Sequence, residues 1–167
     1  MLYVPVDYLY FLINHYNIFS LIIMRSKHII MSKDKEISAF IANWSKDDNL
    51  CKNAFIELKD YLSAKDDIVL DFIAREGLTY SLRATHVHQK NRPLFVMVDV
   101  IEDEPRWLSV CFYGQMVTDP EETGDFVPDG LLGEDALCFD LESYQSRILG
   151  YLRDRIDEAH RRAADTE

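Results

Sequence analysis

The stretch LTYSLRAT, residues 78–85, decides the fold class, because its side chains alternate between apolar and polar. A period of two is typical of a strand with one buried and one polar face. Strands are also predicted at Asp67–Ala74, Leu94–Ile101, Arg106–Tyr113 and Ala136–Leu141. Sequential strands with short connections usually pair antiparallel. The sequence therefore predicts an antiparallel sheet of about five strands.

Apolar residues recur at helical spacing on both sides of these strands. Residues 37–44 and 51–62 predict two N-terminal helices. Residues from about Glu142 to Ala163 predict one long C-terminal helix, with Asp140 as its N-cap. Helices at both ends of such a sheet pack together on one face. We therefore predict a single two-layer α+β domain over residues 31–167.

The first thirty residues have a different composition from the rest of the chain. They contain no Ala, Gly or Glu and are rich in residues that AT-rich codons specify. Residues 8–24 carry no full charge and reach the lower edge of the length that spans a bilayer. We expect residues 1–30 to be a non-native or disordered apolar extension. A single-span anchor and a structured extension are the alternatives.

Charge and cysteine content restrict the compartment and the partners. The chain has 18 Lys and Arg against 29 Asp and Glu, a net charge of −11. This balance argues against nucleic acid and, unless residues 8–24 are an anchor, against a membrane partner. Three cysteines without a CxxC pair fit neither a disulfide framework nor a zinc site. We therefore predict a soluble cytoplasmic protein in which Cys111 and Cys138 are small buried hydrophobes.

If the helices cover one face of the sheet, the alternation assigns the residues of the other. The covered face would include Leu78, Tyr80 and Leu82 of the first strand discussed, and Val98 and Val110 of two later strands. The uncovered face mixes aromatic, sulfur-containing and charged groups, as ligand and partner sites do. Its predicted members are Asp71, Ile73, Ser81, Arg83, Phe95, Met97, Asp99, Trp107, Ser109, Cys111 and Tyr113.

Asp99 is unusual because it lies inside an otherwise apolar strand. One hypothesis makes it an acid/base group or a ligand anchor, with Arg83 as its charge partner. The other makes Arg83 and Asp99 a structural cross-strand ion pair. The sequence leaves both hypotheses open, and the ion pair is the simpler one.

The stretch Thr118–Asp135, TDPEETGDFVPDGLLGED, is predicted to be a loop with seven acidic and no basic residues. Clustered carboxylates suit Ca²⁺ or Mg²⁺, but the spacing does not match an EF-hand. A lid or partner-binding loop and a plain solvated loop are the other hypotheses. His86 and His88 would share a strand face, as metal ligands require, but the sequence identifies no third ligand.

The run RPLFVMVDVIEDEPRWLSVCFYGQMVTDPEETGDFVPDGLLGEDALCFDLE, Arg92 to Glu142, resembles an uncharacterised family of small bacterial proteins. No activity is associated with that family, so the resemblance assigns no functional residue. The order of elements is also loosely similar to that of the MmcQ/YjbR-like domains. Those are small α+β proteins, some of them proposed to bind DNA.

These patterns predict a non-catalytic module that binds a protein partner or a small ligand, without a cofactor or metal. The alternatives are a carboxylate- or metal-dependent hydrolase using Asp99 with Asp119, Glu134 or Asp135, and an acidic decoy for a basic partner. No nucleophile elbow, P-loop, dinucleotide-binding or HExxH motif is present. The candidate binding residues are Arg83, Asp99, Trp107, Tyr113, Asp119 and Glu134.

Overall fold

The computed structural model of the chain describes residues 33–165 and divides the chain into two units, 1–38 and 39–167. Residues 33–38 of the first unit are helical, as are residues 39–43 of the second. The predictions about residues 1–30 lie outside the described residues. Among the helices that the structure describes, none is long and apolar enough to cross a membrane. Everything below concerns the second unit.

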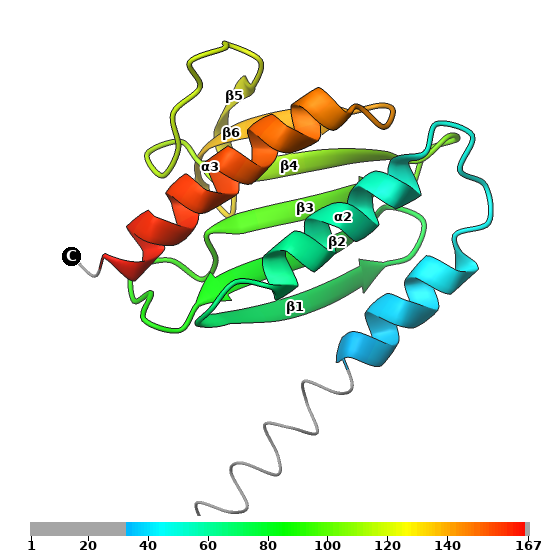
Figure 1. Cartoon of the computed structure of the whole chain (residues 1–167), viewed down its shortest axis with the longest axis horizontal. Helices are drawn as coiled ribbons and strands as arrows, with labels where there is room; N and C mark the ends of the chain where they lie inside the picture. Colours follow the sequence, from blue (N-terminus) through cyan, green and yellow to red (C-terminus); the bar gives the residue numbers. More distant parts are fainter. Residues whose placement is uncertain (1–32, 166–167) are drawn as a thin grey trace, which may run out of the picture. The chain divides into compact units, whose positions relative to one another are not determined.

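Six antiparallel strands form one open sheet in the order β1-β2-β3-β4-β6-β5. This confirms the predicted α+β class and antiparallel sheet (Figure 1). The strands are β1 (Ile68–Arg75), β2 (Thr79–His86), β3 (Val96–Ile101), β4 (Trp107–Tyr113), β5 (Asp125–Leu131) and β6 (Glu134–Leu141).

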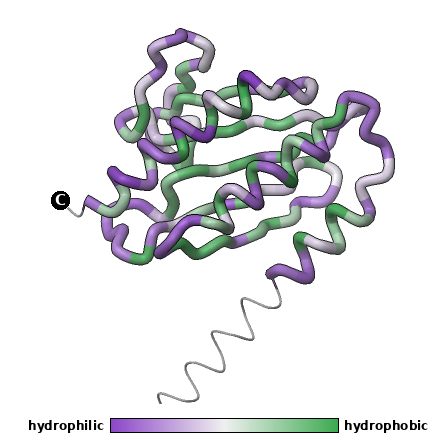
Figure 2. Tube along the Cα trace, viewed as in Figure 1, coloured by the Kyte–Doolittle hydropathy of each residue, from purple (hydrophilic) through white to green (hydrophobic). Residues whose placement is uncertain are grey.

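Two helices, α2 (Cys51–Ser63) and α3 (Ser146–Ala164), cover the same face of the sheet (Figure 1). The side chains beneath them alternate with those on the other face, as the period of two predicts. One row of cross-strand neighbours on the covered face is buried on five of the six strands, β1, β2, β3, β4 and β6. It consists of Phe72, Leu82, Val98, Val110 and Phe139. Figure 2 shows hydrophobic residues along these central strands and hydrophilic residues in the connecting loops.

The prediction that residues 118–135 form one loop is wrong, because β5 lies within it and β6 begins at Glu134. The stretch contains Pro128 and Gly130, which are typical of loops. Proline is nevertheless tolerated at a sheet edge or a bulge. β5 is the edge strand, and its pairing with β6 is irregular between Val127 and Leu131.

The C-terminal helix begins later than the predicted Glu142, and Asp140 is not its N-cap. Asp140 lies in β6, where it accepts a hydrogen bond from the Ser109 hydroxyl at 2.6 Å. Asn49 is hydrogen-bonded to the segment between β6 and α3. Its side-chain amide donates to the Glu142 backbone carbonyl at 2.8 Å, and its backbone carbonyl accepts the Tyr144 N–H at 2.9 Å.

The predicted assignment of faces is wrong for two side chains, Phe95, which was assigned to the uncovered face, and Leu78, which was assigned to the covered face. Phe95 precedes β3, where the regular alternation does not hold, and its ring packs 5.6 Å from that of His160 on α3. Leu78 is 66% exposed, because it belongs to the turn between β1 and β2 rather than to a strand.

Candidate functional site

We call the sheet surface that faces away from α2 and α3 the open face. Cross-strand partners point to the same side of a sheet, so the register identifies its members. One row consists of Asp71, Arg83, Met97, Cys111, Cys138 and Asp125. The next consists of Ile73, Ser81, Asp99, Ser109 and Asp140. The mixed face that the sequence predicted is therefore present, without Phe95.

Arg83 and Asp99 both lie on the open face but are not direct neighbours. The register places Arg83 opposite Met97 and Asp99 opposite Ser81. No ion pair joins Arg83 and Asp99, so the structure contradicts the hypothesis of a cross-strand ion pair. Burial raises the pKa of the Asp99 carboxyl, against the opposing effects of the Ser81 hydroxyl and the charge on Arg83.

Three buried polar atoms of the open face have no hydrogen-bond partner in the described part of the chain. Native structures leave few such groups unpaired, and each one needs an explanation. The other unpaired atoms among the described residues belong to Glu102, Arg153 and Arg155, whose charges are compensated by salt bridges. Ser81 and Asp99 are direct cross-strand partners whose side chains interact, so they do not belong to this set. The three open-face atoms are Thr79 Oγ1, Arg83 Nε and the Tyr113 hydroxyl.

Tyr113 and Glu134, two of the predicted site residues, are brought together by Arg92. The Arg92 guanidinium lies 4.8 Å from the centre of the Tyr113 ring. It donates from Nε and Nη2 to one carboxylate oxygen of Glu134, at 2.9 and 2.8 Å. Burial, and then the charge of Glu134, raise the pKa of Tyr113. Sequence reasoning missed Arg92, whose only signal was a basic side chain in the loop before β3.

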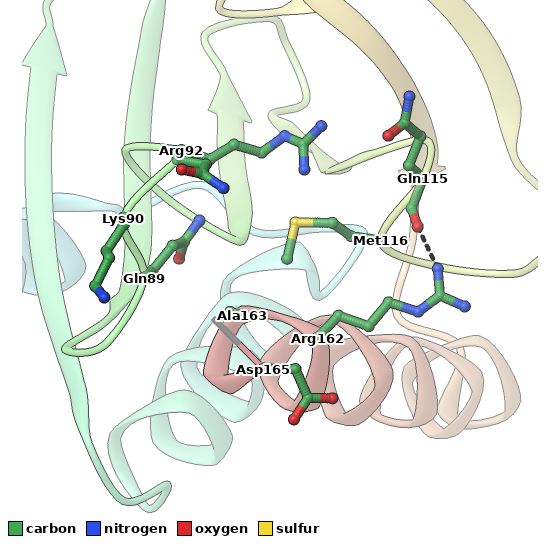
Figure 3. Close-up of a pocket in the computed structure, with 9 residues that line it drawn as sticks. Gln89, Lys90, Arg92, Gln115, Met116, Arg162, Ala163 and Asp165 are labelled. Carbon is green, nitrogen blue, oxygen red and sulfur yellow. Dashed lines mark hydrogen bonds between the residues drawn. The ribbon is translucent and has the colours of Figure 1, made fainter. Parts of the chain in front are cut away.

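Two hollows adjoin this cluster and share Arg92 and Gln115 in their walls. The larger one, of about 550 Å³, lies between Tyr113 and the β5–β6 hairpin, and we call it the hairpin hollow. The smaller one, of about 360 Å³, lies at the C-terminal end of α3. Figure 3 shows Met116 of this smaller hollow between the side chains of Arg92 and Arg162.

The remaining predicted residues lie apart from this cluster. Trp107 is at the opposite end of β4 from Tyr113, and its indole N–H donates to Asp103 at 2.8 Å. Asp119 accepts hydrogen bonds from the Tyr151 hydroxyl of α3 and from the Gly124 N–H. Burial opposes these hydrogen bonds, but together they lower the pKa of Asp119. Asp119 therefore anchors its loop to α3, on the helix side of the sheet.

These positions separate the carboxylates that the hydrolase hypothesis requires. Asp99 lies within the sheet, Asp119 bonds to the helix layer and Glu134 is paired with Arg92. Over residues 33–165, no group of three or more His, Cys, Asp or Glu side chains is placed to hold a metal ion. No observation on the site favours the hydrolase over a binding module.

His86 and His88 acquire a third neighbour that the sequence could not identify. The centre of the His86 ring lies 4.9 Å from that of His160 on α3 and 5.4 Å from that of His88. The His88 backbone N–H donates to His86 Nδ1 at 3.2 Å. Burial and the two neighbouring imidazoles lower the pKa of His86. These contacts pack the His86 ring at the end of β2 against His160 of α3.

Cys111 and Cys138 form a disulfide, which contradicts the prediction that both are free thiols. They are direct cross-strand partners on β4 and β6, with their Cα atoms 4.1 Å apart. Their separation of 27 residues gave no sign of this contact. The third cysteine, Cys51, is buried and free, and burial raises the pKa of its thiol to about 11.

No protein-family model, curated protein or solved structure matches this chain. The two resemblances drawn from the sequence therefore stay predictions, and the function is argued from the geometry of the open face.

Asp99→Asn is expected to gain stability relative to the native chain as the pH rises. Because burial raises the Asp99 pKa above 3.8, the folded state holds this proton more tightly than the unfolded chain does. Raising the pH from the pKa of the unfolded chain through that of the folded state therefore destabilises the native protein. Asparagine does not titrate, so the variant escapes this loss. The measurement is the difference in Tm between variant and native chain from about pH 4 to about pH 8.

The control for this experiment is Asp154→Asn, which changes an exposed carboxylate of α3. Its difference in Tm should vary less with pH than that of the Asp99 variant. A difference for Asp99→Asn that stays constant, or that shrinks as the pH rises, would contradict the argument.

Proposed function

We propose that this chain is a non-catalytic binding module whose open face takes a segment of a partner protein that carries basic side chains. The observation that carries the proposal is the set of three buried polar atoms without partners, Thr79 Oγ1, Arg83 Nε and the Tyr113 hydroxyl, all on the open face. Their number and position favour a bound segment, because it supplies both backbone and side-chain donors and acceptors. Pairing such groups on binding avoids the cost of leaving them buried and unmatched.

The charge of the open face supports a basic partner. Three arginines lie on it or against it: Arg75, Arg83 and Arg92, the last of which is paired with Glu134. Five carboxylates lie on the same face, those of Asp71, Asp99, Asp125, Glu134 and Asp140. The net charge of the whole chain, −11, has the same sign. A basic segment is therefore attracted to this face, and an acidic one or a nucleic acid is repelled.

Selection of peptides from a random display library on the full chain tests the proposal. The open-face double variant, Asp125→Lys with Asp140→Lys, reverses two exposed charges that lie on β5 and β6. We expect the selected peptides to lose about tenfold or more in affinity for this variant, since like charges then oppose the basic segment. Fluorescence anisotropy with each labelled peptide measures the change.

The matched control reverses two exposed charges of the helix layer, with Asp60→Lys on α2 and Asp154→Lys on α3. Both double variants are first checked by thermal unfolding. The proposal is overturned if no peptide is enriched, or if the two double variants weaken the selected peptides equally.

A further inference from the structure

We propose that the hairpin hollow binds a cationic side chain, an arginine guanidinium or a lysine ammonium. This inference rests on the proposed function, because the side chain belongs to the segment that occupies the open face. It goes further by assigning one cavity and one type of contact. The hollow opens beside Tyr113 and Glu134, and both of these belong to the open face.

The charges around the hollow favour a cation. Its walls contain the carboxylates of Asp129, Glu134 and Asp135 and a single base, Arg92. Arg92 is held by two hydrogen bonds to Glu134, so these two charges offset each other. The Asp135 carboxylate accepts the Asp129 backbone N–H at 3.2 Å and has no basic partner among the described residues. Two negative charges therefore remain without a basic partner in the described part of the chain.

An independent observation points to a ligand at the same place. Tyr113 lines the hollow and is 1% exposed, yet its hydroxyl has no hydrogen-bond partner among residues 33–165. An N–H of a guanidinium or ammonium group would donate to this oxygen. The ring of Tyr113 also offers a face to a cation, as it already does to Arg92.

Apolar side chains in the same walls suit the carbon stem of lysine or arginine. Phe126 is 63% exposed, although its strand neighbour Leu137 lies half-buried beside it. Both line the hollow. Long basic side chains bury their methylene groups against such surfaces while the charged end stays near carboxylates. The volume of about 550 Å³ falls within the range of about 300–1,000 Å³ found for ligand sites.

The smaller hollow, although lined by basic side chains, is not proposed as a site for an anion. Two of its three basic side chains, Arg92 and Arg162, already have carboxylate partners in Glu134 and Glu158. It also lies at the C-terminal end of α3, where the helix dipole disfavours an anion.

An NMR titration of the full chain with the capped tripeptide acetyl-Gly-Arg-Gly-amide tests the inference. We expect saturable shifts of the Gly114 and Gly133 amide signals, because both residues line the hollow. The same tripeptide with neutral citrulline in place of arginine should bind more weakly. Asp129→Asn with Asp135→Asn should weaken the arginine peptide by about fivefold, since each exposed ion pair contributes up to about 1 kcal/mol.

Asparagine suits both positions, because it tolerates the positive φ of 54° at Asp129 and keeps an acceptor oxygen at Asp135. The matched control is Glu122→Gln with Asp154→Asn, which removes two exposed charges outside the hollow and should leave the affinity unchanged. The inference is overturned by shifts that do not saturate, by equal binding of the citrulline peptide, or by an unchanged affinity of the Asp129/Asp135 variant.

The library peptides separate this inference from the proposed function. If they lose affinity for the open-face double variant but bind the Asp129/Asp135 variant normally, the hollow is not a cation site and the proposed function stands. If the arginine tripeptide titrates into the hollow while the library peptides ignore the open-face charges, the proposed function fails and the hollow remains a cation site.

Discussion

Phe112→Ala is expected to lower the free energy of unfolding by about 3–5 kcal/mol. Phe112 is fully buried on β4, and its ring packs edge-to-face on Phe139 of β6 at 6.0 Å. Truncating the ring removes its burial energy and leaves a cavity that the packed layers cannot close. Urea unfolding of the native chain and the variant, followed by tryptophan fluorescence, measures the difference.

Phe126→Ala is the matched control, because Phe112, Leu137 and Phe126 are successive neighbours across β4, β6 and β5. Phe126 therefore faces the same side of the sheet, but it lies at the edge and is 63% exposed. Its truncation should change the unfolding free energy by less than about 0.5 kcal/mol. Equal losses for the two variants would contradict the assignment of one to the core and the other to the surface.

The core of the sheet was predictable, because alternation along a strand needs only local sequence. Leu82, Val98 and Val110 were assigned to the covered face from their strands alone, and all three are buried there. Local patterns failed where the chain leaves the regular period, at the turn residue Leu78 and at Phe95 before β3. Strand β5 was missed because Pro128 and its neighbours are as typical of a loop as of an irregular edge strand.

The candidate site was predictable only in part, because its contacts join distant segments. The alternation placed Arg83, Asp99 and Tyr113 on one face, and the register agrees. It could not place Arg92 against Glu134, 42 residues later, since no local pattern records that contact. For the same reason it could not show that Asp119 bonds to Tyr151 on the helix side.

The open face is also where the sequence departs from the rule that buried polar groups are paired. Away from the open face, the unpaired buried atoms belong to Glu102, Arg153 and Arg155, whose charges are compensated by salt bridges, and His86 is partnered by the His88 backbone. On the open face Thr79 Oγ1, Arg83 Nε and the Tyr113 hydroxyl are buried without a hydrogen-bond partner among residues 33–165. Such departures from otherwise consistent rules are expected at functional sites, so the asymmetry between the two faces favours binding over a purely structural role.

The Cys111–Cys138 disulfide leads to the second large expected effect. Reducing it should lower the free energy of unfolding by about 2–4 kcal/mol, because the link closes a loop of 27 residues in the unfolded chain. Urea unfolding with and without reductant measures this loss. Cys111→Ala with Cys138→Ala should start from the lower stability, and reductant should not change it further.

A thiol count decides whether the disulfide is present before its energy is measured. Of the three cysteines only Cys51 is free, so the denatured, unreduced chain should contain one reactive thiol and the reduced chain three. In the native chain even that thiol should react slowly, since Cys51 is fully buried with a pKa of about 11. Three thiols before reduction would contradict the link. Because the disulfide lies in the row of Arg83 and Met97, its loss would then also free two thiols at the centre of the proposed binding face.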